Sequence, residues 1–372
     1  RFLGEGAETK AAEARAYLDV KHPGWAGETG LTVETSTVKP ESVGVAAALE
    51  VSTPEARAYA KELVPMYELW NGGRTKAERL ALLAGRVNDY LAQFHVPPVM
   101  LDAPNGGRGG AFDQLNWQIE IGADGLAGDT QTPEQFAYVC GVAMHEAVHV
   151  RQTFRAARTS PSLAQGRIDK GTYDAAVEMN AGSRPGESMD PASVAWAEGG
   201  EMAKAFWGSG AAYRSIVYDV LKTTGADFNA ARVAAAKVKG QPRNSPDRAA
   251  AAKELVAAKT AYDRAHDAYM MLPEEYPAWK TGKETEAAVK ERIHLNDQLA
   301  LAEATEKAAY ERYQQAEQIA IDAAIDETKA SPAQQESFDN ALARHKKAIE
   351  AVEKLRVKIA KLSVAAATGA TP

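Results

Sequence analysis

Two histidines and a glutamate in the stretch 132–155 have the types and the spacing for metal chemistry. His145 and His149 are four residues apart and Glu146 directly follows the first histidine, so the chain contains the run HEAVH. In a helix, residues four apart lie one above the other on the same face, so both imidazoles can bind one metal ion. Glu146 lies one step around the helix, where its carboxylate can act as a general base on a water without being a ligand.

The surrounding sequence predicts the helix that this geometry requires. Thr132 is a suitable N-cap, Pro133 suits the first helical position, and Gln135 completes a capping box with Thr132. Apolar residues then recur at three- and four-residue spacing, which predicts a stripe buried against a core. These residues are Phe136, Val139, Cys140, Ala143 and Ala147. The two histidines are therefore expected beside the stripe, at the edge of a buried cleft.

A small sheet is expected next to this helix. The stretch 110–121, GAFDQLNWQIEI, alternates apolar and polar residues in its second half and predicts one half-buried β-strand. Amphipathic helices are predicted for 52–70 and 75–95, and an extended segment for 96–104. The fold class expected is therefore α+β and mostly α. The order of these elements resembles that of a zincin core, and this resemblance implies a small sheet whose edge strand borders the HExxH helix.

A zinc site of this kind needs a third protein ligand, with water in the fourth position. The sequence after the motif lacks the histidine of an HExxHxxGxxH pattern, which points to a glutamate from later in the chain. Three glutamates on predicted helices are candidates, namely Glu178, Glu201 and Glu275. We favour Glu275 because Pro273 precedes a predicted helix start there, and because the small Ala278, one turn on, leaves room for close approach to the motif helix.

Two motifs carry a resemblance to a known family. The first has the form HExxHxxQ and ends at Gln152, and the second is a looser pattern of Tyr, Leu-Pro, Glu and Ala. The second pattern consists of Tyr269, Leu272, Pro273, Glu275 and Ala278. The chain resembles the bacterial HExxH metallopeptidase-like domains, of the gluzincin class, that occur in polymorphic toxins and in proteins associated with extracellular contractile injection systems. The resemblance covers about 75–155 and 262–282.

This resemblance implies a zincin-like core and a zinc-dependent metalloendopeptidase, in which the two motif histidines and Glu275 hold Zn²⁺ and Glu146 is the general base. In proteins of this type the strand before the HExxH helix borders the cleft and pairs with an extended peptide substrate. A donor for the oxyanion is also needed, and Tyr269 and Tyr276 are the candidates, with Tyr269 preferred.

The chain departs from the thermolysin-like pattern at one position. In that pattern an acidic residue four positions after the third ligand orients a histidine, whereas this sequence has Trp279 there. Another group must therefore hold the imidazoles, and Asp113 and Glu120 are candidates. The other histidines are each expected to be surface or core residues without a role in the site. They are His22, His95, His266, His294 and His345.

Composition excludes several classes of site and partner. The net charge of −7 gives no reason to expect nucleic acid as a partner, and no run of eighteen apolar residues predicts a membrane span. The single cysteine, Cys140, cannot form an intrachain disulfide or a cysteine cluster for zinc. The expected partner is a protein or peptide substrate.

Three regions are predicted along the chain. They are an N-terminal helical or irregular region at 1–70, a zincin-like core at 71–282 with a helical insertion at about 156–245, and an α-helical region at 283–372. The last region is rich in Ala, Glu, Lys and Gln. A helix restart at Ser331 predicts a long, coiled-coil-like antiparallel hairpin, followed by a disordered tail from Val364. Such a hairpin either braces the core or docks a protein partner.

The expected role is a secreted or injected toxin or effector. The first residues, RFLGEGAETK, show no apolar core of a signal peptide, and the chain starts with Arg, so we expect a trimmed chain with a cytoplasmic location as the alternative. Two other functions use the same residues. One is a catalytically inactive zincin-like component of a toxin or delivery assembly, and the other is a zinc hydrolase acting on a non-peptide amide.

Overall fold

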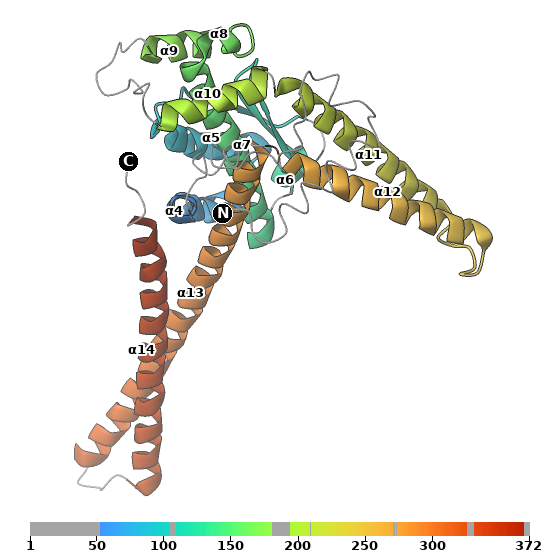
Figure 1. The fold of residues 1–372 in the computed structure, drawn as a ribbon. Coiled ribbons are helices and arrows are strands. Elements are labelled where there is room, and N and C mark those ends of the chain that lie inside the picture. The colour runs from blue at the N-terminus through green and yellow to red at the C-terminus, as the bar shows by residue number, and fades with distance from the viewer. Residues whose placement is uncertain are drawn as a thin grey trace. The chain divides into compact units, whose positions relative to one another are not determined.

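The computed structural model describes residues 53–104, 107, 109–128, 130–180, 194–208, 210–270, 272, 274–325 and 331–367. These residues are mostly helical and include a small three-stranded sheet, which confirms the expected α+β, mostly α class. The helices are α4 (Thr53–Trp70), α5 (Lys76–Ala92), α6 (Ala123–Leu126), α7 (Pro133–Thr159), α8 (Pro161–Ala164), α9 (Lys170–Asn180), α10 (Val194–Trp207), α11 (Ala211–Lys237), α12 (Pro246–Met270), α13 (Glu275–Ile325) and α14 (Pro332–Ala367) (Figure 1).

The chain divides into two compact units. Among the described residues, the first unit comprises Leu83–Asp124 and Val142–Gly282. The second comprises the described parts of Ser52–Leu82, Gly125–Gly141 and Lys283–Pro372. The sheet, the HExxH run and α8 to α12 belong to the first unit, and α4 and α14 belong to the second. Residues 1–52, most of the predicted N-terminal region, lie outside the described residues.

The sheet consists of β1 (Met100–Asp102), β2 (Gly110–Asp113) and β3 (Gln118–Ile121) in the order β1-β3-β2. β1 pairs with β3 in parallel, and β2 pairs with β3 antiparallel, with Gly110 opposite Ile121 and Asp113 opposite Gln118. β2 is therefore an edge strand of this sheet. Strands as short as these are stable only when packed against other elements.

The prediction of one continuous strand over 110–121 is wrong, because a tight turn divides it into β2 and β3. The carboxylate of Asp113 accepts hydrogen bonds from the backbone N–H groups of Leu115, at 2.9 Å, and Asn116, at 3.2 Å. Trp117 then adopts a positive φ of 48°. An aspartate that bonds its own backbone two residues on is a turn former. Leu115 is consequently 59% exposed instead of facing the core.

The capping of α7 follows the sequence prediction. The backbone N–H of Thr132 donates to Gln135 Oε1 at 2.9 Å, and the N–H of Gln135 donates to Thr132 Oγ1 at 3.3 Å. This reciprocal pair satisfies two donors at the helix start. All five residues of the predicted apolar stripe are buried. Burial also raises the pKa of the Cys140 thiol, which is an inert core residue.

In the first unit, α11 and α12 pack against each other and bring the chain back to α7. Their interface is a cluster of five buried apolar residues, Val217, Val220, Ala265, Ala268 and Leu272. The last of these lies at the corner between α12 and α13. The described part of the predicted insertion, 156–245, thus contains α8, α9, α10 and α11. The packing of α11 on α12 fixes where α13 begins.

In the second unit, side chains of α13 and α14 meet in antiparallel order. The ring of Tyr313 lies 5.6 Å from that of Phe338, Tyr310 lies 5.1 Å from His345, and Glu303 accepts a hydrogen bond from Arg356 at 3.0 Å. Residues nearer the end of α13 thus contact residues nearer the start of α14, as in an antiparallel pair.

Two boundaries of this long pair differ from the sequence prediction. α13 begins at Glu275 rather than near 283, because Pro277 lies in its first turn, where proline is tolerated, and the single Gly282 does not interrupt the helix. α14 continues to Ala367, so the first four residues of the predicted disordered tail are helical. Ala-rich sequence supports this extension, because alanine has the best helix propensity.

Candidate metal centre

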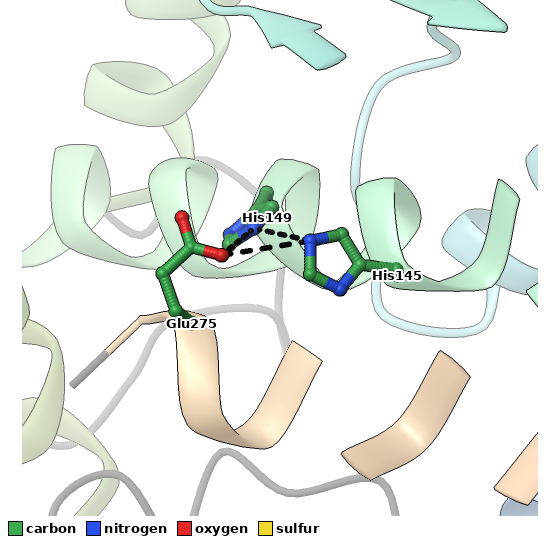
Figure 2. Close-up of side chains that lie close together, drawn as sticks. All are labelled: His145, His149 and Glu275. Carbon is green, nitrogen blue, oxygen red and sulfur yellow. Dashed lines mark hydrogen bonds and ion pairs between the residues drawn. The ribbon is translucent and has the colours of Figure 1, made fainter. Parts of the chain in front are cut away.

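Helices α7 and α13 bring three potential ligands together inside the first unit. His145 and His149 project from α7, and Glu275 projects from the first turn of α13 (Figure 2). The two Nε2 atoms are 3.1 Å apart, and Glu275 Oε2 lies 3.6 Å from His145 Nε2 and 3.4 Å from His149 Nε2. Within the described residues, these three form the one group of His, Cys, Asp and Glu side chains that could hold a metal ion.

The separations fit a tetrahedral ion. Ligand atoms at about 2.0–2.1 Å from such an ion lie about 3.3–3.4 Å from one another. The carboxylate of Glu275 provides a second indication, because Oε1 accepts a hydrogen bond from the Tyr218 hydroxyl at 2.8 Å whereas the buried Oε2 has no hydrogen-bond donor. A buried carboxylate oxygen without a donor is costly unless a cation satisfies it. The group therefore fits a divalent ion.

The turn before α13 determines which of two adjacent glutamates faces the histidines. The Leu272 carbonyl accepts hydrogen bonds from the N–H groups of Glu275, at 3.0 Å, and Tyr276, at 3.2 Å, and these bonds start the helix. Glu274, fully buried, instead accepts a hydrogen bond from Arg214 Nε at 2.6 Å. Ala278, one turn after Glu275, is fully buried, as expected for a small residue at a close approach.

Gln152 is the residue that orients His149. Its Oε1 lies 3.0 Å from His149 Nδ1, so Nδ1–H donates to it and the Nε2 lone pair is left facing the candidate metal position. The Gln152 amide also donates to the Glu274 carbonyl at 3.0 Å, which ties α7 to the turn before α13. Asp113, a sequence candidate for this role, instead bonds within its own turn.

Trp279, which replaces the acidic residue of the thermolysin-like pattern, packs against the other histidine. Its ring lies 4.9 Å from the His145 ring, inclined at 65°. The ring of His266 also packs against Trp279, with 5.8 Å between the two ring centroids. His145 is therefore held by an aromatic contact, whereas His149 is held by an amide.

The charges of the three candidate ligands are strongly coupled. Burial would raise the pKa of Glu275, but attraction to His149, and then to His145, lowers this pKa to about 2. Burial would lower the pKa of His149, but the Glu275 carboxylate raises it to about 9. Burial and then repulsion from His149 lower the pKa of His145 to about 3. The Glu275 carboxylate thus favours a positive charge beside it, and a metal ion can supply this charge in place of the His149 proton.

Glu146 lies between the candidate ligands and β2. Its Oε1 is 3.9 Å from His145 Nε2. Burial raises the pKa of its carboxyl to about 7, although the attraction of His149 and a backbone hydrogen bond from Phe112 of β2 both lower this pKa. The close approach of β2 requires a glycine, since a Cβ on Gly110 would lie 2.9 Å from Glu146 Oε1 and 2.7 Å from Val142 Cγ1. A carboxyl with this pKa can both accept and donate a proton near neutral pH.

A cleft of about 710 Å³ opens over these residues. Its lining includes β2, the two motif histidines, Glu146 and Glu275, together with Arg214, Tyr218 and Tyr269. Burial and the charge of Glu275 raise the pKa of both tyrosines, so both keep their hydroxyl protons. Tyr276, the other sequence candidate for an oxyanion donor, is not among the lining residues. Tyr218 was not predicted from the sequence, because nothing in its spacing connects it to the motif.

The two competing glutamates lie elsewhere. Glu201 is exposed and pairs with Lys204 at 2.6 Å, and Glu178 is also exposed on α9. Neither belongs to the group that could hold a metal ion. Of the three candidates left open by the sequence, Glu275 is the one that meets the histidines.

A comparison of the chain with family models, with curated proteins and with solved structures finds no match. None of the described helices combines the length and the apolar character that crossing a membrane requires. The function must therefore be inferred from the residues of the site and their geometry.

Proposed function

We propose that this chain is a zinc-dependent metalloendopeptidase. The observation that supports it most strongly is the convergence of His145, His149 and Glu275 at tetrahedral spacing, with Glu146 beside them on the cleft. Two imidazoles and one carboxylate, with a fourth position open to solvent, are the ligand set of catalytic zinc in peptidases. The resemblance of the two sequence motifs to toxin-associated metallopeptidase-like domains supports the same function and a role as a delivered effector.

Zinc bound by the three ligands would act as a Lewis acid that lowers the pKa of a water and polarises the scissile carbonyl. Glu146 accepts the proton of the attacking water as the water oxygen bonds to the carbonyl carbon. The same carboxyl then delivers this proton to the amide nitrogen as the C–N bond breaks. Its position 3.9 Å from His145 Nε2, and its pKa of about 7, suit both steps.

The edge strand β2 offers a way to position an extended peptide. β2 lines the cleft and pairs only with β3 within the described sheet. Its other edge therefore offers backbone groups to a substrate, apart from the Phe112 N–H, which bonds Glu146. Tyr269 also lines the cleft, and its protonated hydroxyl is our candidate donor to the oxyanion. Tyr269 also interacts with Glu275, but the shorter contact is that of Tyr218, which donates to Glu275 Oε1 at 2.8 Å and is assigned to ligand orientation.

Elemental analysis and proteolysis of the full chain and its Glu146→Gln variant test this function. We expect one zinc per chain in both proteins, cleavage of an unfolded protein by the parent chain, and a loss of about 10²–10⁴-fold in the variant, because only the proton carrier is removed. Glu120, a sequence candidate for holding the imidazoles, is not among the residues that line the cleft, so Glu120→Gln on strand β3 serves as a control that keeps activity.

Other outcomes identify the alternatives. Full activity in Glu146→Gln would exclude the proposed mechanism. A chain that neither contains zinc nor cleaves peptides after zinc is added is an inactive binding component. A chain that contains zinc but cleaves no protein or peptide points to a non-peptide amide as substrate.

A further inference from the structure

Helices α13 and α14 enclose a groove of about 1150 Å³ in the second unit. Its lining comes from 304–319 of α13 and 333–351 of α14 alone, and eight of the seventeen lining residues are alanine. Alanine side chains keep the floor of the groove close to the two backbones, so a third helix can approach closely. Another helix of the second unit, α4, packs against α14, but it contributes no residue to this lining.

Two large apolar residues of α13 are exposed, one at the end of the groove lining and one just before its start. Leu301 is 70% exposed and Ile319 is 51% exposed. The two are eighteen residues apart, which is five complete helical turns, so they lie on the same face of α13. Ile319 lines the groove, and the face of Leu301 continues it toward the start of α13. Exposed apolar side chains arranged along one face indicate a surface that another protein covers.

The charged residues of the groove are mainly basic. Arg312, Arg344 and Lys347 line it against a single acidic residue, Glu336, so its net charge is 3 − 1 = +2. None of the three cations forms an ion pair with a described residue. Arg356, further along α14, differs in this respect, because it pairs with glutamates on both α13 and α14. The three groove cations are therefore available to a partner.

We propose that this groove binds an acidic amphipathic helix of a partner protein. Such a helix would place a stripe of small or apolar residues on the alanines, and its flanking carboxylates would meet Arg312, Arg344 and Lys347. The span 304–319 extends about 24 Å at 1.5 Å per residue, so about four turns of the partner would be bound. The inference uses none of the residues of the candidate metal centre and does not depend on the proposed activity.

The charges argue against a second copy of this chain as the occupant. Arg312 and Arg344 lie near the middle of the two lining stretches, so docking groove to groove would bring four guanidinium groups together. A largely alanine-lined groove with a net charge of only +2 also lacks the density of cations that binds nucleic acid.

The test uses two synthetic peptides of about eighteen residues with the same Ala/Leu stripe, one flanked by glutamates and the other by lysines. Fluorescence anisotropy measures their binding to the full chain at low and high salt. We expect the acidic peptide to bind at least about tenfold more tightly than the basic one, and less tightly at high salt. Lys347→Glu should weaken binding by about threefold or more, and Lys346→Glu, the same change one residue away and outside the groove lining, should not.

Several results would overturn the proposal. Equal affinity for the two peptides, or no binding of the acidic peptide, would exclude an acidic helix as the occupant. Equal losses of peptide affinity in Lys347→Glu and Lys346→Glu would show that the overall charge of α14, and not the groove, attracts the peptide. A dimer in light scattering that Ala309→Glu, in the groove lining, converts to a monomer would identify a second copy as the occupant.

Discussion

Glu274 and Glu275 are adjacent, both buried, and have different partners. Arg214 neutralises Glu274, while Glu275 extends one oxygen to the Tyr218 hydroxyl and the other toward the two histidines. Glu274 thus has the compensating charge that a buried acidic group requires, whereas Oε2 of Glu275 has no hydrogen-bond donor. Because Arg214 satisfies Glu274, the negative charge left for a metal ion is that of Glu275.

At this scale we expect Glu275→Gln to abolish tight metal binding. The amide keeps the size of the side chain but removes the charged ligand. Loss of a residue that only hydrogen-bonds to a ligand lowers metal affinity by up to about 100-fold, so loss of the ligand itself should lower zinc affinity by more than that. Competition with a chromophoric chelator measures this affinity. Glu178→Gln and Glu201→Gln are matched controls that should bind zinc like the parent chain. Loss of zinc in either control, with retention in Glu275→Gln, would contradict the assignment of the third ligand.

Among the elements, two glycines allow close approach to α7, one at the HExxH motif and one near the end of the helix. Gly110 admits β2 against Glu146, and Gly199 admits α10 against Thr159. A Cβ on Gly199 would lie 2.6 Å from Thr159 Cγ2 and 3.2 Å from the Arg155 carbonyl oxygen. Each glycine has a neighbour that is free of such contacts, since a Cβ on Gly109 or on Gly200 would meet nothing within 4 Å.

Gly110→Ala should impair peptide hydrolysis while zinc stays bound. The added Cβ meets Val142 and Glu146 at under 3 Å, so either β2 moves away or the general base is displaced. A displacement of about 1 Å near a reacting centre can lower the rate about 100-fold. Turnover and zinc content are measured together. Gly109→Ala is the control and should keep full activity; if it loses as much activity as Gly110→Ala, the strand position is not the cause.

Gly199→Ala and Gly200→Ala should have opposite effects on the free energy of unfolding. The first forces a methyl group against Thr159 and the α7 backbone, and such overpacking costs about 1–3 kcal/mol. The second replaces a helical glycine by alanine in open space and should stabilise α10 by up to about 1 kcal/mol. Denaturant unfolding of the two variants checks the signs. Equal stability of the two variants would show that α10 does not pack closely on α7.

At the scale of the whole molecule, a bound ion would join segments that are far apart in the chain. His145 and His149 belong to α7, Glu275 begins α13, and Gln152 already connects the same two regions 122 residues apart. Binding to the folded state alone adds stability that grows with the free metal concentration.

Removal of metal by a chelator should therefore lower the unfolding temperature of the chain, and added zinc should restore it. At free zinc of about 1,000 times the dissociation constant, the gain is about 4 kcal/mol. Scanning calorimetry of the full chain measures the shift. Glu275→Gln provides the control, in which zinc should produce almost no shift. An equal shift in that variant would mean that zinc stabilises the chain from another site.

Features that depend on neighbouring residues could be predicted from the sequence alone. The spacing of His145 and His149 fixes their common face, because an α-helix brings residues four apart into line. The Thr132–Gln135 capping box and the apolar stripe likewise act within one or two turns, so the start and the buried face of α7 followed from the sequence. The mostly helical class followed from the same local patterns.

Features that depend on packing between distant segments became visible only in the folded chain. It selected Glu275 over Glu178 and Glu201, joined Gln152 to the turn before α13, and brought Tyr218 to the carboxylate. It also divided the predicted strand by an aspartate turn, which the alternating pattern does not reveal because Leu115 and Trp117, although they lie in the turn, continue the alternation of β3. Residue spacing determines which side chains share a face of one helix or strand. The packing of α11 on α12, in contrast, determines which distant carboxylate reaches α7.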